Sequence, residues 1–152
     1  MSGNAAMLKQ VVNPTYAPIT HPATPFGTFE AFYPFYLGEH SNRVNRIFHL
    51  VGTSVALTCH ARVVAALVSY LLRRQTSVQV GPEVGKVLNR LALSAGEAGK
   101  VFLTGIIGAY TCAWIGHFFV EKNRPATFKY PLFSLRGDFR MLWEVLSLQR
   151  SL

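Results

Sequence analysis

Two long apolar blocks, residues 47–72 and 101–121, constrain the fold of this chain more than any other feature. About 20 predominantly apolar residues suffice for a helix that crosses a bilayer. Hydrophobic residues make up 50% of the sequence and charged residues only 14%, whereas a soluble domain carries about 25% charged residues. The sequence therefore predicts an all-α, multi-helix integral membrane protein, with two to four membrane-embedded helices and amphipathic helices at the membrane interface.

The length of 152 residues predicts one folded domain. Residues 1–27 contain four prolines among small polar residues, which indicates a flexible tail and no cleavable signal peptide. Residues 28–150 are then expected to form a single helical membrane domain. Within it, the aromatic-rich segment 28–38 fits either a membrane interface or an ordinary aromatic core.

The net charge of +8 indicates contact with anionic lipid headgroups rather than with nucleic acid. No basic run exceeds the pair Arg73-Arg74, and the basic residues flank the apolar blocks. Lysine and arginine are more abundant around the two termini than in the connection 73–100. With two spans the termini share one side, so the positive-inside rule favours cytoplasmic termini.

Polar and small residues inside the blocks predict how the helices pack. We interpret His60 as structural, and expect Arg62 either to reach a polar partner or to mark a bend. A stripe of small residues in the second block would let another helix approach closely; it comprises Gly105, Ala109, Ala113 and Gly116. After the second block, residues 128–148 are expected to form an interfacial turn and then an amphipathic helix. Asp138 on this helix either faces the active region or, as we prefer, is a helix-start or surface carboxylate.

The segment 39–53 carries a polar stripe at helical spacing, to which His49 belongs and His40 does not; the stripe comprises Asn42, Asn45, Arg46 and His49. Nine residues at 100° each would place these histidines on opposite faces of one continuous helix. Ser41 or Asn42 is a suitable N-cap residue. If both histidines serve one site, the helix must begin after His40, in agreement with the capping signal.

The segment 114–131 carries His117 and Glu121, which are four residues apart. On a helix this spacing places both side chains on one face, about one turn apart. Arg124-Pro125 is expected to stop the helix, because the residue before a proline disfavours helical geometry.

His40, His49, His117 and Glu121 all fall at ends of the apolar blocks that two spans would bring to the same membrane face. Ionisable groups at membrane depth are costly and are therefore candidates for function. Imidazoles and a carboxylate suit a first-row transition metal, and two histidines with one carboxylate are typical of non-haem Fe(II) oxygenases. Zinc and hydrolytic chemistry are an alternative. So is a purely structural role, with the histidines capping helices or binding lipid phosphates.

The segments 35–53 and 114–131 together resemble the family of the yeast 2-hydroxy fatty acid dioxygenase, which serves the breakdown of phytosphingosine to odd-numbered fatty acids. The resemblance covers about residues 28–146 and is closer to the short branch of the family. It implies a membrane protein of the endoplasmic reticulum type that carries out Fe(II)-dependent α-oxidation. A 2-hydroxy fatty acid and O₂ would give a fatty acid one carbon shorter and CO₂.

The resemblance further implies that His40, His49 and His117 are the iron ligands, and that Glu121 completes the second motif. Asn45, inside the first motif, becomes a candidate substrate-binding or supporting group. Lys122 or Arg124 could hold the substrate carboxylate at headgroup level.

The expected partners are the lipid bilayer, a 2-hydroxy fatty acid and O₂. Two other functions stay open at this point, a non-enzymatic membrane scaffold or lipid-binding protein and a metal-dependent lipid hydrolase.

Overall fold

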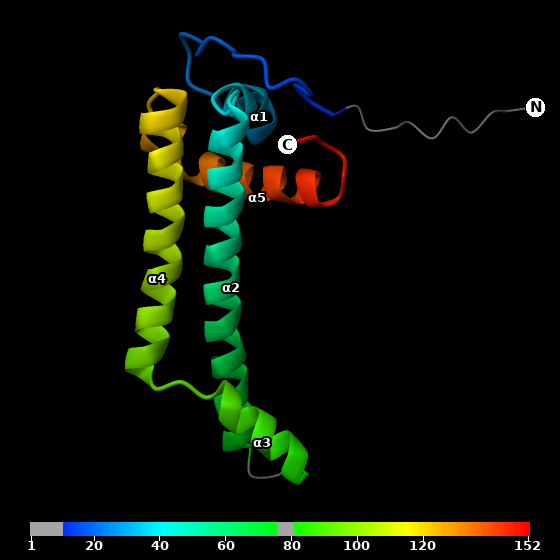
Figure 1. Cartoon of the computed structure of the whole chain (residues 1–152), viewed down its shortest axis with the longest axis vertical. Coiled ribbons are helices and arrows are strands. Elements are labelled where there is room, and N and C mark those ends of the chain that lie inside the picture. The colour runs from blue at the N-terminus through cyan, green and yellow to red at the C-terminus, as the bar shows by residue number, and fades with distance from the viewer. Residues whose placement is uncertain (1–10, 76–80) are drawn as a thin grey trace, which may run out of the picture. The chain divides into compact units, whose positions relative to one another are not determined.

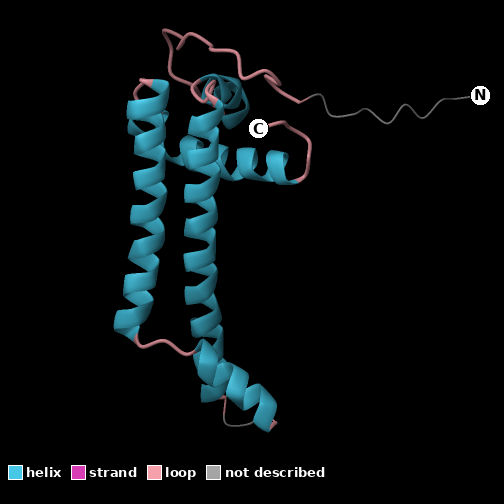
Figure 2. Cartoon of the chain, in the orientation of Figure 1, coloured by secondary structure: helices cyan, strands magenta, loops and turns pink. Residues whose placement is uncertain are grey.

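The computed structural model describes residues 11–75 and 81–152, and every regular element in these ranges is a helix (Figures 1 and 2). In chain order they are α1 (Phe29–Gly38), α2 (Arg43–Arg74), α3 (Pro82–Leu91), α4 (Ala95–Trp114), the π-helix η1 (Ile115–Glu121), the short 3-10 helix η2 (Ala126–Phe128) and α5 (Pro131–Leu146). The predicted all-α fold class is thereby confirmed.

The chain divides into two compact units, and α2 and α4 each run from one unit into the other. Unit 1 comprises the chain up to Leu50 together with Ala113–Leu152, and unit 2 comprises Val51–Cys112. The single helical domain expected over 28–150 stays a prediction. Of the expected flexible tail, residues 1–10 lie outside the described residues.

The two long helices are the candidate membrane spans, Arg43–Arg74 and Ala95–Glu121, with mean hydropathies of 1.7 and 1.4. Only 11% and 17% of their most apolar windows are buried, whereas the core helix of a soluble protein would be mostly buried. Large apolar side chains such as Val64, Leu67 and Ile107 are more than half exposed. Both helices are therefore long and apolar enough to cross a membrane and present apolar surface to it.

Unit 2 holds α2 and α4 close together through small residues, as the stripe predicts. A Cβ atom on Gly52 would lie 2.9 Å from Cys112 Cβ, and one on Gly105 would lie 2.9 Å from Cys59 Cβ. Larger side chains at these two glycines would push the helices apart.

Arg62 in unit 2 finds a polar partner and does not bend α2. Its Nη1 donates to the carbonyl of Leu91 at 2.7 Å, at the end of α3, where helix carbonyls lack partners. His60 Nδ1 lies 2.6 Å from the Ala56 carbonyl one turn earlier. Both residues belong to unit 2, whereas His40, His49 and His117 belong to unit 1.

Unit 1 has an aromatic core, and of the two interpretations of the segment 28–38 this is the one that the structure shows. Thr28 caps α1 by accepting from the Ala31 N–H at 3.3 Å. The core lies largely on this helix; its buried members are Tyr16, Phe29, Phe32, Tyr33, Phe35, Tyr36, Leu37 and Met141. Tyr16 comes from the expected flexible tail and is only 3% exposed, so its ring anchors the described part of that tail to the core.

Helix α5 covers α1 with one face and presents apolar residues on the other. Gly137 lets the helix approach closely, since a Cβ there would lie 2.9 Å from the Tyr36 ring. On the outer face Leu132, Trp143 and Leu146 are 77%, 65% and 70% exposed. Such a face suits a helix that lies in the membrane interface.

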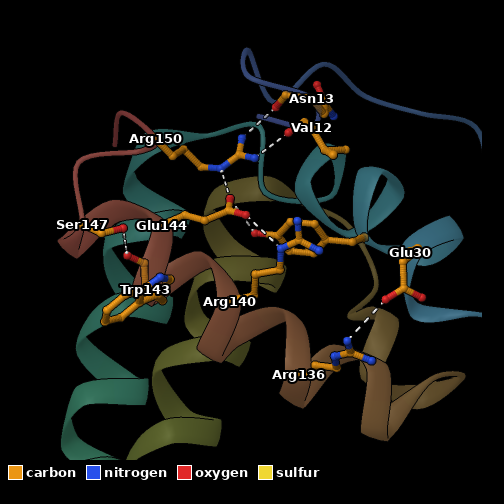
Figure 3. A network of polar contacts seen from close by, with 10 residues as sticks. Val12, Asn13, Glu30, Arg136, Arg140, Trp143, Glu144, Ser147 and Arg150 are labelled. Carbon is orange, nitrogen blue, oxygen red and sulfur yellow. Dashed lines mark hydrogen bonds and ion pairs between the residues drawn. The ribbon is translucent and has the colours of Figure 1, made fainter. Parts of the chain in front are cut away.

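A buried carboxylate, Glu144, joins the ends of unit 1 (Figure 3). It accepts from Arg150 Nε at 2.8 Å, from Arg140 Nε at 2.9 Å and from the Tyr33 hydroxyl at 3.0 Å. The Arg150 guanidinium also donates to the backbone carbonyl of Asn13 at 2.8 Å. One ionic network thus ties α1, α5, the N-terminal segment and the C-terminus together.

We expect Glu144→Gln to lower the free energy of unfolding by about 3 kcal/mol, because it leaves Arg150 buried without a counter-charge. Denaturant unfolding in detergent measures the change. Glu30→Gln is the matched control: it breaks the exposed pair with Arg136 (Figure 3) and should cost less than about 1 kcal/mol. Equal losses in the two variants would contradict the role of the Glu144 network.

Stability should also depend on pH through Glu144. Burial raises the pKa of its carboxyl group, but hydrogen bonds from Arg150 and Arg140 outweigh burial and hold the pKa below its usual value of 4.5. A carboxyl group with a depressed pKa in the folded state stabilises above its unfolded value, and this contribution is lost as the pH falls. The difference in unfolding free energy between wild type and Glu144→Gln should therefore shrink below about pH 4.5.

Candidate metal centre

Three histidines from separate elements of unit 1 converge in its interior. His40 follows α1, His49 lies on α2 and His117 lies in η1. Their exposed fractions are 1%, 6% and 3%. One ring nitrogen from each lies within 4.8 Å of the other two. Ligand nitrogens in a tetrahedral site with bonds of about 2.1 Å lie about 3.4 Å apart, so the rings would close in by up to about 1.4 Å to bind one ion.

The three rings meet edge to face. Their centroids are 4.3 Å apart for His40 and His49, 4.8 Å for His40 and His117, and 4.9 Å for His49 and His117. The ring planes cross at 88°, 71° and 83°, respectively. No ring stacks on another, so each can direct one nitrogen towards the shared space.

Each histidine has a protein acceptor at its Nδ1 atom. The partner of His40 Nδ1 is the Tyr36 carbonyl at 2.6 Å. His49 Nδ1 lies 2.8 Å from Asp138 Oδ1, and His117 Nδ1 lies 2.7 Å from Asn123 Oδ1. A carbonyl, a carboxylate and an amide oxygen can only accept, so every Nδ1 carries the proton and every Nε2 presents a lone pair. Acceptors of this kind commonly fix the orientation of metal-bound histidines.

This pattern leaves lone pairs that face each other. Nε2 of His40 lies 3.2 Å from Nε2 of His49, yet both nitrogens are acceptors when their Nδ1 atoms donate. Burial, together with the neighbouring imidazoles, lowers the pKa of His40 well below its usual value of 6.5. The donor set is therefore suited to a cation other than a proton, and three neutral imidazoles are ligands of first-row transition metals.

The turn between α1 and α2 allows His40 and His49 to face each other, although their spacing would place them on opposite faces of one continuous helix. The Asn42 side chain accepts from the Val44 N–H at 2.9 Å, which confirms the predicted cap and starts α2 after His40. Arg46 Nη1 then donates to the His40 carbonyl at 2.8 Å, while its guanidinium lies 3.8 Å from the centroid of the Tyr16 ring. These contacts fold His40 back over the first turns of α2.

His117 is placed by a π-helix rather than by the continued α-helix that the sequence predicts. Lys122 ends η1 in the left-handed region, with φ at 59°, and its N–H bonds to the His117 carbonyl. The helix thus stops before Arg124-Pro125. Gly116 permits a very close approach to α2, because a Cβ there would overlap Asn45 Oδ1. Single π-helical turns occur frequently at functional sites.

Glu121 is not among the clustered ligand atoms and binds the start of α2. Its carboxylate accepts from the Ser41 hydroxyl, from the Asn42 N–H at 3.0 Å and from Asn45 Nδ2 at 3.1 Å. A carboxylate at the N-terminus of a helix satisfies free N–H groups and interacts favourably with the helix dipole. In this geometry Glu121 positions the elements that carry the histidines.

The three residues predicted to bind substrate lie in different surroundings. Asn45 is fully buried and connects α2 with Glu121. Lys122 is exposed and does not line a described cavity, whereas Arg124 lines a pocket of unit 1. Their contact with substrate stays a prediction.

Sequence reasoning missed the acceptors that orient the rings. Asp138, interpreted as a surface carboxylate, accepts from His49 Nδ1 and, at 2.5 Å, from the Tyr36 hydroxyl. Asn123 follows η1 and accepts from His117. The Tyr36 carbonyl binds His40 from one turn earlier. Asn123 and Tyr36 are short-range partners that the motif spacing could have suggested. Asp138 is 89 residues from His49, and only the folded chain brings the two together.

The fold and the cluster define a helical membrane protein with a buried three-histidine candidate site for a metal ion. A family model described as "2-hydroxy-palmitic acid dioxygenase Mpo1-like" matches residues 26–150. The chain therefore belongs to the Mpo1-like family, which confirms the family resemblance of the sequence motifs. No curated protein and no solved structure matches the chain.

Two carboxylate variants separate ligand support from helix positioning. We expect Asp138→Asn to weaken Fe(II) or Zn²⁺ binding about 10- to 100-fold, because the amide supports His49 less well than a carboxylate does. Glu121→Gln should leave metal affinity nearly unchanged and lower thermal stability. Titration calorimetry and metal analysis measure the first effect, with His117→Ala as the variant that loses the site. Metal loss in Glu121→Gln at unchanged stability would instead identify Glu121 as a ligand.

Proposed function

We propose that this protein is an Fe(II)-dependent dioxygenase that converts 2-hydroxy fatty acids into fatty acids one carbon shorter. The observation that carries the proposal is the convergence of three buried imidazoles, each held at Nδ1, in a chain of the Mpo1-like family. The family description supports the dioxygenase and 2-hydroxy fatty acid themes. The metal, the reaction and the substrate of this chain are the proposed part.

Iron suits the donor set of His40, His49 and His117, because imidazole is a ligand of intermediate softness that binds Fe(II). These three residues would hold the ion, which would supply activation of O₂ and of the 2-hydroxy acid. The protein itself contributes neutral, oriented nitrogens in a dry interior. Asp138 makes the His49 ring a stronger donor through its hydrogen bond at Nδ1.

The proposed reaction balances without a further reductant. One 2-hydroxy acid and one O₂ give the shortened acid, CO₂ and water. The bond between the first and second carbons breaks, the second carbon becomes the new carboxyl group, and the four electrons lost by the substrate reduce O₂. The chain therefore needs no second cofactor for this stoichiometry.

The aromatic core controls access of water to the cluster. The His40 ring lies 4.3 Å from the Tyr36 ring, and Tyr36 is 1% exposed. A site with low water content strengthens electrostatic interactions and limits side reactions of activated oxygen. Tyr36 supports two of the three histidines. Its carbonyl accepts from His40, and its hydroxyl donates to Asp138, which accepts from His49.

The two long apolar helices support a membrane location for the reaction, where an acyl chain is dissolved. From the family resemblance and the distribution of basic residues we propose the endoplasmic reticulum membrane, with cytoplasmic termini. The substrate is then a lipid breakdown product that reaches the site from the bilayer.

Anaerobic loading of the purified protein with Fe(II), followed by 2-hydroxypalmitate and O₂, tests the proposal. We expect pentadecanoate by mass spectrometry, with one O₂ consumed per product. His117→Ala should lose product because the ligand set is incomplete. His60→Ala is the matched control, because His60 lies in unit 2 outside the cluster, and it should retain activity.

Each other outcome has a defined meaning. Absence of product in iron-loaded wild type would favour a scaffold or a lipid-binding protein. Product in His117→Ala would reject the ligand assignment. Hydrolysis of a lipid ester with zinc and without O₂ would point to a metal-dependent hydrolase.

A further inference from the structure

Unit 1 contains a cavity of about 590 Å³. It is formed by the N-terminal segment around His21, the end of α1 at Glu39 and the turn 124–130. Its volume lies within the range of small-molecule sites, about 300–1,000 Å³. None of the three clustered histidines lines it.

The cavity carries two cations that lack an acidic partner. Arg124 and Lys129 line it, and neither forms an ion pair in residues 11–75 and 81–152. The one carboxyl group in the lining is Glu39, whose Oε2 accepts from Asn123 Nδ2 at 3.2 Å. The pocket thus offers positive charge to a ligand, while its own carboxyl group is hydrogen-bonded to Asn123.

Both cations are held in place by aromatic groups. His21 Nδ1 lies 2.6 Å from the Pro22 carbonyl and must donate to it, so Nε2 is an acceptor. That nitrogen accepts from the Tyr130 hydroxyl at 3.0 Å and from Lys129 Nζ at 3.3 Å. The Arg124 guanidinium lies 5.2 Å from the centroid of the Phe128 ring. Such contacts reduce the entropy lost when the cations bind an anion.

Most of the rest of the wall is apolar, and the pocket adjoins the end of a candidate membrane span. Ile19, Phe35, Phe128 and Tyr130 line the pocket, and Phe128 is 54% exposed. Arg124 follows the end of the span Ala95–Glu121 by only three residues. Cations beside apolar surface at the end of a membrane span would suit an amphiphile with a negative head and a hydrocarbon chain.

We propose that this pocket, the Arg124–Lys129 pocket, binds an acyl lipid with an anionic head, namely the carboxylate of a fatty acid or the phosphate of an anionic phospholipid. Glu39 lines the same pocket, and Asn123 connects it to His117. The pocket is nevertheless a binding site in its own right and needs no metal in the histidine cluster.

Native mass spectrometry of the full chain in detergent with EDTA tests the pocket without involving the metal centre. The ligands are palmitate, its uncharged ester methyl palmitate, phosphatidic acid and phosphatidylcholine. We expect palmitate or phosphatidic acid to bind at least about tenfold more tightly than methyl palmitate and phosphatidylcholine, corresponding to about 1.4 kcal/mol. Binding of palmitate alone identifies a fatty-acid site, and binding of phosphatidic acid alone identifies a phospholipid site.

The double variant Arg124→Gln/Lys129→Gln should weaken binding of the anionic ligand at least about tenfold. The matched control is Arg43→Gln/Arg136→Gln, which removes the same charge from exposed cations outside the pocket. It should leave binding nearly unchanged, and equal thermal unfolding of the variants shows that both are folded. Equal binding of palmitate and methyl palmitate, or an equal effect of the two double variants, would overturn the proposal.

Discussion

The hydrogen bond at Nδ1 of each clustered histidine is the interaction on which the arrangement of unit 1 depends. It fixes which nitrogen carries the proton and which presents a lone pair. The three acceptors have unlike origins: the Tyr36 carbonyl on α1, the Asp138 carboxylate on α5 and the Asn123 amide after η1. A displacement of any of these elements rotates a ring and moves its Nε2 away from the common point. The aromatic core and the Glu144 network therefore support the site, because they hold α1 and α5 in fixed positions relative to each other.

Much of the fold followed from patterns that act over short distances. Apolar length predicted the two long helices, and Asn42 predicted where α2 begins. The phase difference between His40 and His49 required a helix start between them, which is where the structure has it. Local capping and helical periodicity are properties of neighbouring residues, and a single sequence contains them.

The remaining features depend on contacts between distant segments. Nothing in the neighbourhood of Asp138 distinguishes it from an ordinary surface carboxylate; its role arises because Gly137 allows α5 to approach Tyr36. Glu121 shows the reverse case. Its spacing from His117 suggested a shared ligand face, but the N-terminus of α2 offers unpaired N–H groups that bind its carboxylate. The π-helical turn at 115–121 likewise includes the close approach of Gly116 to Asn45, which helical periodicity does not record.

The opposed lone pairs of His40 and His49 have a consequence beyond catalysis. The two nitrogens lie 3.2 Å apart in a buried position, where a cation between them would offset their mutual repulsion. A ligand that binds only the folded state stabilises it in proportion to the logarithm of its concentration. A metal ion at the proposed site would therefore stabilise the folded form of unit 1 as well as supply its chemistry.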